Sequence, residues 1–131
     1  MRAADAALVN GTAAHAFELD DYHNAKLHPG AVVVSAALAV AEKLNCSGTQ
    51  LVTAIAAGYE VMIRTSLALN PSAARLRGWH LTGGCGPFGA AAAGPSPMRP
   101  EPERCGGALW VAGTRGPGAG ASEGRSPIAH G

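Results

Sequence analysis

The stretch "AVVVSAALAVAEKL", residues 31–44, decides the fold class of this chain. It is apolar on every side until Glu42 and Lys43, which is typical of a helix buried in the middle of a bundle. Its three consecutive valines also permit a strand, but the run is longer than a usual strand. We therefore expect a buried helix here, and an all-α fold, a partial helical bundle, around it.

The segments on either side of this helix are helical in pattern as well. Residues 3–16 are rich in alanine, the best helix former, although Asn10 and Gly11 weaken the centre and permit a bend. After residue 44, Ser47 and Gln50 have the spacing of a capping box. A stripe of larger side chains follows at intervals of four and three: Leu51, Ile55, Tyr59 and Met62. Further along, "GWHLTGGCGPFGAAAA", residues 78–93, predicts a glycine-rich turn and a short helix.

Composition excludes several classes of function. The chain has 131 residues, enough for one domain, and a formal net charge of +1, which favours neither nucleic acid nor anionic membrane as a partner. Its three cysteines form no paired spacing, so neither a disulfide framework nor a structural zinc site is indicated. The longest uncharged apolar stretch, Leu27 to Ala41, is shorter than the roughly 18 to 20 residues that span a bilayer. We expect a soluble, cytoplasmic protein.

The composition changes near residue 94. Residues 1–93 are mostly apolar and are assigned to a partial helical domain, whereas residues 94–131 contain nine glycines and six prolines. Such a segment buries too little apolar surface to offset the cost of ordering its backbone, so we expect it to be disordered. Because a GC-rich gene yields this composition when read in another frame, we hypothesise that residues 94–131 are out of frame and that the chain is truncated.

Ionisable residues are concentrated in "HAFELDDYHNAKLHPG", residues 15–30. His28 precedes Pro-Gly and the buried helix, so it lies near helix N-terminal amides that favour an anion such as a carboxylate. Asp20 and Asp21 are candidates to orient an imidazole or to act as acid or base. The alternative is a solvated loop whose acids cap the next helix. Asp20, Asp21, His23 and His28 are competent metal ligands, but their spacing matches no helical ligand motif, so we expect no metal.

A second candidate, His80, lies between Trp79 and the glycines of "LTGGCGPFG". Backbone N–H groups there, at Gly83 and Gly84, are candidates to bind an anion. The glycines do not form a dinucleotide-binding fingerprint, because no strand precedes them. Cys85 is assigned to packing, since nothing beside it except His80 indicates an activated thiolate.

Two blocks of the sequence, "ALVNGTAAHAFELDDYHNAKLHPGAVVVSAALAVAE" and "GWHLTGGCGPFGAAAA", resemble the MmgE/PrpD family over roughly residues 3 to 93. The resemblance implies a helical domain joined to a smaller α/β domain, usually in a homodimer, with no required metal or organic cofactor. It implies catalytic roles for three residues: Asp21, His28 and His80. We add four candidates for binding a small polycarboxylate substrate: Asp20, Lys26, Gly83 and Gly84.

The resemblance also implies a reaction class. The family includes 2-methylcitrate dehydratase of propionate metabolism and cis-aconitate decarboxylase, so we expect a lyase that removes a proton next to a carboxylate, with loss of water. Decarboxylation and epimerisation stay open. The later lysines and tyrosine of the family have no counterpart here, so we expect the chain to be inactive alone. The alternative is a non-catalytic helical interaction module. RNA binding by the tail is disfavoured, because its few arginines are interleaved with glutamates.

Overall fold

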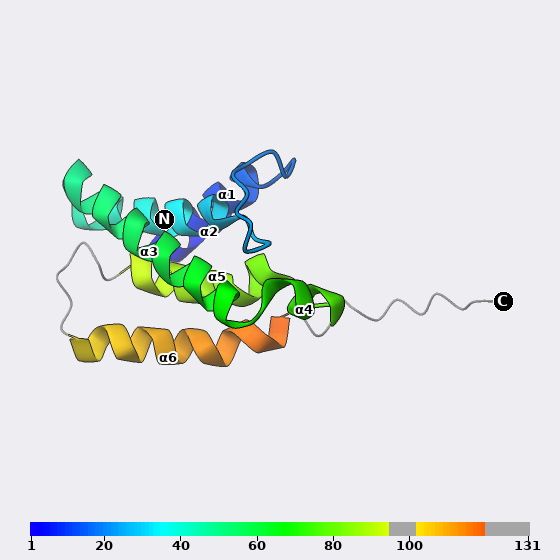
Figure 1. Ribbon diagram of the computed structural model, residues 1–131. Coiled ribbons are helices and arrows are strands. Elements are labelled where there is room, and N and C mark those ends of the chain that lie inside the picture. The colour runs from blue at the N-terminus through cyan, green and yellow to red at the C-terminus, as the bar shows by residue number, and fades with distance from the viewer. Residues whose placement is uncertain (95–101, 120–131) are drawn as a thin grey trace.

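The computed structural model describes residues 1–94 and 102–119. These residues form six helices and no β-strand, so the prediction of an all-α fold is confirmed. The helices are α1 (Ala3–Ala14), α2 (Pro29–Leu44), α3 (Gly48–Ala68), α4 (Pro71–Leu76), α5 (Leu81–Ala93) and α6 (Pro102–Ala119) (Figure 1).

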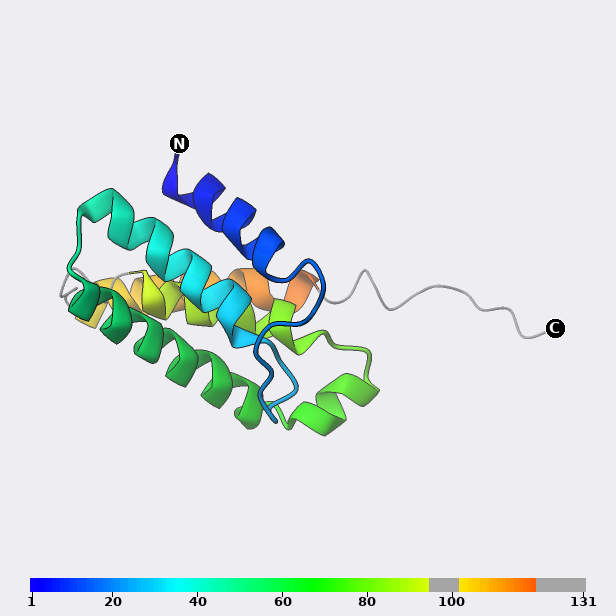
Figure 2. The same ribbon diagram turned by 90° about the horizontal axis from the view of Figure 1, so that it is seen from above.

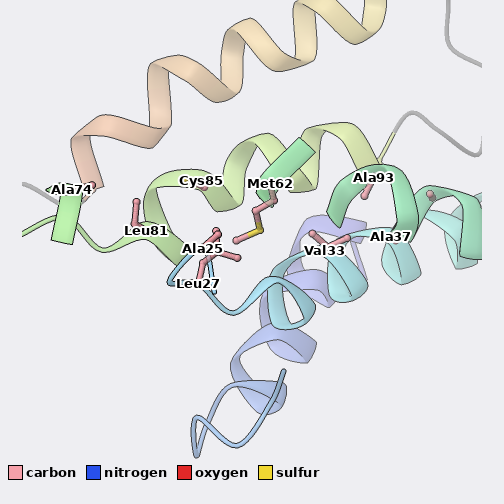
Figure 3. Packing of buried hydrophobic residues seen from close by; sticks show 10 residues of the cluster. Ala25, Leu27, Val33, Ala37, Met62, Ala74, Leu81, Cys85 and Ala93 are labelled. Carbon is pink, nitrogen blue, oxygen red and sulfur yellow. The ribbon is translucent and has the colours of Figure 1, made fainter. Parts of the chain in front are cut away.

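Helix α5 lies at the centre of the bundle. It packs against α2, α3 and α6, while α1 packs on the outer side of α2 (Figures 1 and 2). The core holds ten buried residues from the loop and from helices α2 to α5: Ala25, Leu27, Val33, Ala37, Ala54, Met62, Ala74, Leu81, Cys85 and Ala93. Figure 3 shows the side chain of Met62 pointing toward Ala25 and Leu27. The loop before α2 therefore contributes to the same core as the helices.

Helix α2 is the buried helix that the sequence predicts. It starts after His28, with Pro29 at its first position, and ends at Asn45, which adopts a left-handed conformation with φ of 53°. Seven of its residues are buried, among them Val33, which is fully inaccessible to solvent. Proline suits a first helical position, because it needs no N–H partner there.

Helix α3 begins with the predicted capping box. The N–H of Ser47 donates to Oε1 of Gln50 at 2.8 Å, and the N–H of Gln50 donates to Oγ of Ser47 at 3.3 Å. Met62 of the predicted stripe is fully buried, and Leu51, Ile55 and Tyr59 are partly buried against the core. The stripe therefore faces the bundle as expected.

Helices α3 and α5 approach closely at a pair of glycines. A Cβ placed on Gly58 would lie 2.5 Å from Cγ1 of Val33 and 2.9 Å from the carbonyl oxygen of Gly89. A Cβ on Gly89 would lie 2.9 Å from Cβ of Met62. Neither position has room for a larger residue. Because both glycines lack a side chain, the backbones of α3 and α5 can lie close together here.

One local expectation is corrected, because the glycine-rich segment after His80 is helical from Leu81 onward instead of forming a turn. At Asn10 and Gly11, where the sequence permitted a bend, α1 continues as one helix to Ala14. Gly11 packs closely against α2, because a Cβ on it would lie 3.1 Å from the carbonyl oxygen of Ala31. Tertiary packing thus outweighs the weak helix propensity of glycine in both places.

The structure also differs from the expectation of disorder beyond residue 94. Residues 102–119 form helix α6, which packs along α5. Ala112 is buried, and Gly113 lies beside the ring of Phe88. The short apolar run at 108–112 supplies the contact that composition alone did not reveal. The expectations for residues 95–101 and 120–131 lie outside the described residues.

Helix α3 is long and apolar enough to span a membrane by length and composition. This is weak evidence, because a core helix of a soluble protein passes the same test. Here α3 packs against α2 and α5, and Oγ of Ser66 near its end donates to the carbonyl oxygen of Ala25 at 2.7 Å. These contacts are those of a helix within a bundle.

Candidate active site

The loop between α1 and α2 folds back on itself before it enters α2. The N–H of His23 donates to the carbonyl oxygen of Leu27 at 3.0 Å, and the N–H of Lys26 donates to that of His23 at 2.9 Å. Nδ1 of His23 accepts a hydrogen bond from the N–H of Ala25 at 3.0 Å. Lys26 has a φ of 62°, a left-handed conformation that is uncommon for lysine. This tight turn fixes the direction in which His28 enters the helix.

The two sequence blocks meet at the starts of two helices. His28 is the N-cap of α2 and His80 is the N-cap of α5. The N–H of His28 donates to Oγ1 of Thr82, in the first turn of α5, at 3.1 Å. Figure 2 shows the loop beside the segment that joins α4 to α5. Both candidate histidines therefore lie in one region of the fold.

Asp20 lies at the centre of a cluster with His15 and His28, which we call the Asp20 cluster. Nδ1 of His15 lies 2.9 Å from Oδ1 and 3.1 Å from Oδ2 of Asp20. Nδ1 of His28 lies 3.3 Å from Oδ1 of Asp20. The two imidazole rings are 5.0 Å apart between centroids, and Tyr22 contacts His28 edge-on at 5.3 Å. Burial raises the pKa of Asp20, but hydrogen bonds, chiefly from His15, and the two imidazoles outweigh it, and its pKa lies below the usual value.

The cluster borders a cavity of about 430 Å³. Seven ionisable side chains line it: His15, Glu18, Tyr22, Lys26, His28, Arg75 and His80. Lys26 and Arg75 are cationic at neutral pH, and Glu18 is their anionic counterpart. A second hollow, lined mostly by apolar residues of α1 and α2, adjoins it at His15 and Thr82. The first cavity has the size and the positive charge to take a small polycarboxylate.

Comparison with known proteins assigns this arrangement to a family. A sequence model described as the MmgE/PrpD N-terminal domain matches residues 1–127. The chain belongs to the MmgE/PrpD family. It is 34% identical over 121 residues to the cis-aconitate decarboxylase-like protein oryM of Aspergillus oryzae. The aligned region covers 86% of this chain and 25% of that protein. The chain thus spans about a quarter of the length of that relative. No solved structure matches it significantly.

The family match confirms the resemblance drawn from the two blocks of sequence. It also extends beyond Ala93 and includes helix α6. The hypothesis that residues 94–131 are out of frame stays a prediction, as do the roles assigned to single residues.

In this MmgE/PrpD chain, Asp21 lies apart from the Asp20 cluster. Its Oδ1 accepts a hydrogen bond from the N–H of Gly30, in the first turn of α2, at 2.9 Å. Its Oδ2 accepts one from the hydroxyl of Tyr59 in α3 at 2.8 Å. Burial, with this hydrogen bond, raises the pKa of Tyr59 to about 12. Asp21 therefore links the first turn of α2 to α3 by hydrogen bonds. Its neighbour Asp20, in contrast, contacts the imidazoles of His15 and His28.

The candidates from the second block are also placed differently from the expectation. The N–H of Gly83 donates to Nδ1 of His80 at 3.1 Å, and the N–H of Gly84 donates to the carbonyl oxygen of His80 at 2.9 Å. Both amides already have partners within the helix start, so they do not form the open anion site that the sequence suggested. Cys85 is fully buried, and burial raises the pKa of its thiol, which agrees with a packing role.

Three residues near the MmgE/PrpD cavity were missed in the sequence. His15 is the residue that follows α1; it begins the ionisable stretch of residues 15–30, but nothing in the sequence assigned it a role. Arg75 is in the short helix α4, and no motif marks it. Thr82 was part of the second block, but its bond to His28 depends on the tertiary fold.

The Asp20 cluster is also placed to hold a metal ion. One ligand atom from each of its three residues lies within 4.8 Å of the others. The sequence had considered His23 and Asp21 as ligands, and the structure places both elsewhere. The expectation that the site needs no metal stays a prediction.

Proposed function

We propose that this chain is the helical part of a cytoplasmic lyase that acts on small di- or tricarboxylates. The reaction is removal of a proton next to a carboxylate with loss of water, as in a 2-methylcitrate dehydratase. One observation carries the proposal: His28 and His80, from the two blocks typical of the family, line a single cavity together with Lys26 and Arg75.

Substrate binding rests on the cations of the cavity. Lys26 and Arg75 supply two positive side chains for two carboxylate groups. The N-termini of α2 and α5, which begin at His28 and His80, add partial positive charge on the same side. Because Nδ1 of His80 accepts from the N–H of Gly83, a neutral His80 carries its hydrogen on Nε2 and donates a hydrogen bond to the substrate.

Proton transfer is assigned to His28. It lines the cavity, and its backbone is fixed by Thr82 and by the start of α2. Histidine is the most frequent general base because its pKa lies near neutral pH. Asp21 supports this arrangement by holding the first turn of α2 through Gly30. Decarboxylation or epimerisation of a related acid would use the same contacts, and the similarity to a cis-aconitate decarboxylase-like protein makes decarboxylation the first of these to test.

The test combines binding and turnover. Calorimetry of the purified chain with cis-aconitate and 2-methylcitrate is expected to show binding. Arg75→Gln is expected to weaken that binding about tenfold, the effect of losing one charged hydrogen bond. Arg77→Gln is the matched control, because Arg77 is exposed near α4 and does not line the cavity. Absence of binding by either acid contradicts the proposal.

Turnover is measured with the same acids, by the absorbance of the unsaturated product for dehydration and by release of carbon dioxide for decarboxylation. The chain is expected to be inactive alone, so any turnover is informative, and His28→Gln is expected to abolish it. Glu42→Gln is the control, since Glu42 lies in the same helix that His28 caps but is exposed and does not line the cavity. Binding without turnover is the result expected if residues of the remaining part of the enzyme complete the chemistry.

A second function, a helical interaction module, is favoured by the exposed apolar side chains of the described helices. Leu8 and Val9 in α1 are 71% and 59% exposed, and Trp110 in α6 is 74% exposed. Surfaces of this kind associate with other chains. Size-exclusion chromatography separates the two functions: a discrete oligomer that binds neither acid supports the module. The homodimer implied by the resemblance is proposed for the full-length enzyme.

A further inference from the structure

The Asp20 cluster has a geometry that the proposed roles leave unexplained. Oδ1 of Asp20 faces Nδ1 of His15 at 2.9 Å and Nδ1 of His28 at 3.3 Å. The side chain of Asp20 is 12% exposed and does not line the cavity, whereas both imidazoles do. One carboxylate oxygen of a mostly buried side chain therefore faces two imidazole nitrogens, and both imidazoles line the cavity.

Electrostatics decides which nitrogen of each ring carries hydrogen. An ionised carboxylate only accepts hydrogen bonds, so Nδ1 of His15 must donate to it. Nδ1 of His28 is buried, and among the described residues it has no hydrogen-bond partner of good geometry. Without a hydrogen, its lone pair would face the Asp20 oxygen 3.3 Å away, which is repulsive. The Nδ1–H form of both rings removes this repulsion, and it leaves Nε2 of each ring without a hydrogen.

We propose that His15 is a second acid–base group of the site, paired with His28, and that Asp20 is the positioning residue that holds both imidazoles in the Nδ1–H form. This inference rests on the proposed function, and it names the partner that an elimination requires beside His28. Fixing the tautomer of a catalytic imidazole by a carboxylate on Nδ1 is a general means of directing Nε2 at a substrate.

In the proposed elimination, one imidazole of the pair is neutral and the other is protonated. Nε2 of the neutral imidazole takes the proton from the carbon next to the carboxylate, and the electrons of the C–H bond form the C=C bond. The C–O bond breaks with its electrons on the hydroxyl oxygen. The protonated imidazole gives its Nε2 proton to that oxygen, and water leaves. The two rings exchange roles, and the total charge of the pair is unchanged.

Charged groups surround the pair on the cavity side and on the protein side. Lys26, Arg75 and Glu18 line the same cavity, and Asp20 contacts both imidazoles. Tyr22 and His80 line the cavity as well, and Nδ1 of His80 accepts a hydrogen bond from the N–H of Gly83. With ring centroids 5.0 Å apart, the two imidazoles are close enough to act on adjacent atoms of one small substrate.

The tautomers are tested in the uniformly ¹⁵N-labelled chain by long-range ¹H–¹⁵N spectra of the imidazoles. His15 and His28 are expected to show the Nδ1–H pattern. His23 and His80 provide an internal contrast, because their Nδ1 atoms accept backbone hydrogen bonds from Ala25 and Gly83 and require the Nε2–H pattern. Single histidine-to-glutamine variants assign the signals. An Nε2–H pattern for His15 or His28 overturns the proposal.

Asp20→Ala tests the positioning role. Loss of the Nδ1–H pattern at His15 and His28 together is the expected result, with His23 and His80 unchanged. Asp20→Asn serves if the alanine variant does not fold, and Asp21→Asn is the matched control, because Asp21 contacts Gly30 and Tyr59 and neither imidazole. An unchanged pattern in a folded Asp20 variant rules out the positioning role.

Addition of cis-aconitate to the labelled chain separates this inference from the proposed function. Shifts of the Nε2 signals of both His15 and His28, without a shift at His23, support the pair. Shifts at His28 and His80 alone overturn the pair and leave the proposed function standing. An absence of shifts at every cavity histidine overturns the proposed function and the inference with it.

Discussion

The backbone N–H of His28 donates a hydrogen bond to the hydroxyl oxygen of Thr82, 54 residues later in the sequence, at 3.1 Å. His28 begins α2 and Thr82 lies in the first turn of α5, so the bond links the starts of two core helices. The side chains of His28 and His80 reach the same cavity because these two starts are adjacent. Helix packing and site geometry thus depend on the same contact.

Replacement of Thr82 by valine is expected to lower the free energy of unfolding by about 1 to 3 kcal/mol. Thr82 is 7% exposed, and valine keeps its shape but leaves the partly buried N–H of His28 without its acceptor. Urea denaturation measures the change. Thr82→Ser keeps the hydroxyl and is expected to recover most of the hydrogen-bond contribution; equal losses for valine and serine would show that only the methyl group matters.

Substitution of Gly58 by alanine is expected to destabilise the chain by about 1 to 3 kcal/mol, the range for overpacking a core. The added methyl would overlap Val33 and the backbone of Gly89. Gly48→Ala, in the same helix, is the control, because a Cβ there meets nothing within 4 Å. Equal thermal stability of the two variants would mean that α3 and α5 are not held at this separation.

Local sequence patterns were sufficient for much of the fold. The buried helix α2, the capping box of Ser47 and Gln50, and the positions of His28 and His80 at helix starts all depend on residues within a few positions of each other. Short-range hydrogen bonds and periodic burial decide such features, so they are readable without a structure.

Features that depend on tertiary contacts could not be predicted from the sequence. The sequence cannot distinguish Asp20 from Asp21, because adjacent residues point in different directions only once the loop has folded. Arg75 reaches the cavity through the packing of α4, and His15 through the packing of α1 on α2. Helix α6 was missed because its glycines and prolines dominate the composition, whereas its order depends on a few contacts with α5.

The contribution of Asp20 to stability is expected to disappear in acid. Its pKa is depressed in the folded chain, so the ionised form favours folding at pH values above its unfolded pKa of about 4, and the advantage is lost as pH falls through the lower folded value. The difference in unfolding free energy between the wild-type chain and Asp20→Asn should therefore shrink between about pH 5 and pH 2.

A control for that experiment is Asp5→Asn. Its hydrogen bond with Arg2 also depresses the pKa of Asp5, but this ion pair is on the surface. In about 1 M salt the effect of Asp5 is expected to vanish, because the Debye length falls to roughly 3 Å, while that of the more buried Asp20 persists. A salt-sensitive Asp20 effect would indicate that the cluster is open to solvent.

Alkaline titration tests the link between Asp21 and Tyr59. Tyr59 has a pKa of about 12 in the folded chain, through burial and its hydrogen bond to Asp21, against about 10 for a free phenol. The raised value means that neutral Tyr59 contributes stability below about pH 10, and that this contribution is lost as pH rises toward 12.

Phenolate absorbance is expected to show a step near pH 12 that Tyr59→Phe removes. Asp21→Asn should move that step toward pH 10, because a neutral amide does not oppose ionisation of the phenol as a carboxylate does. A step that stays in place in folded Asp21→Asn would assign the shift to burial alone and would remove the electrostatic part of the link between the loop and α3.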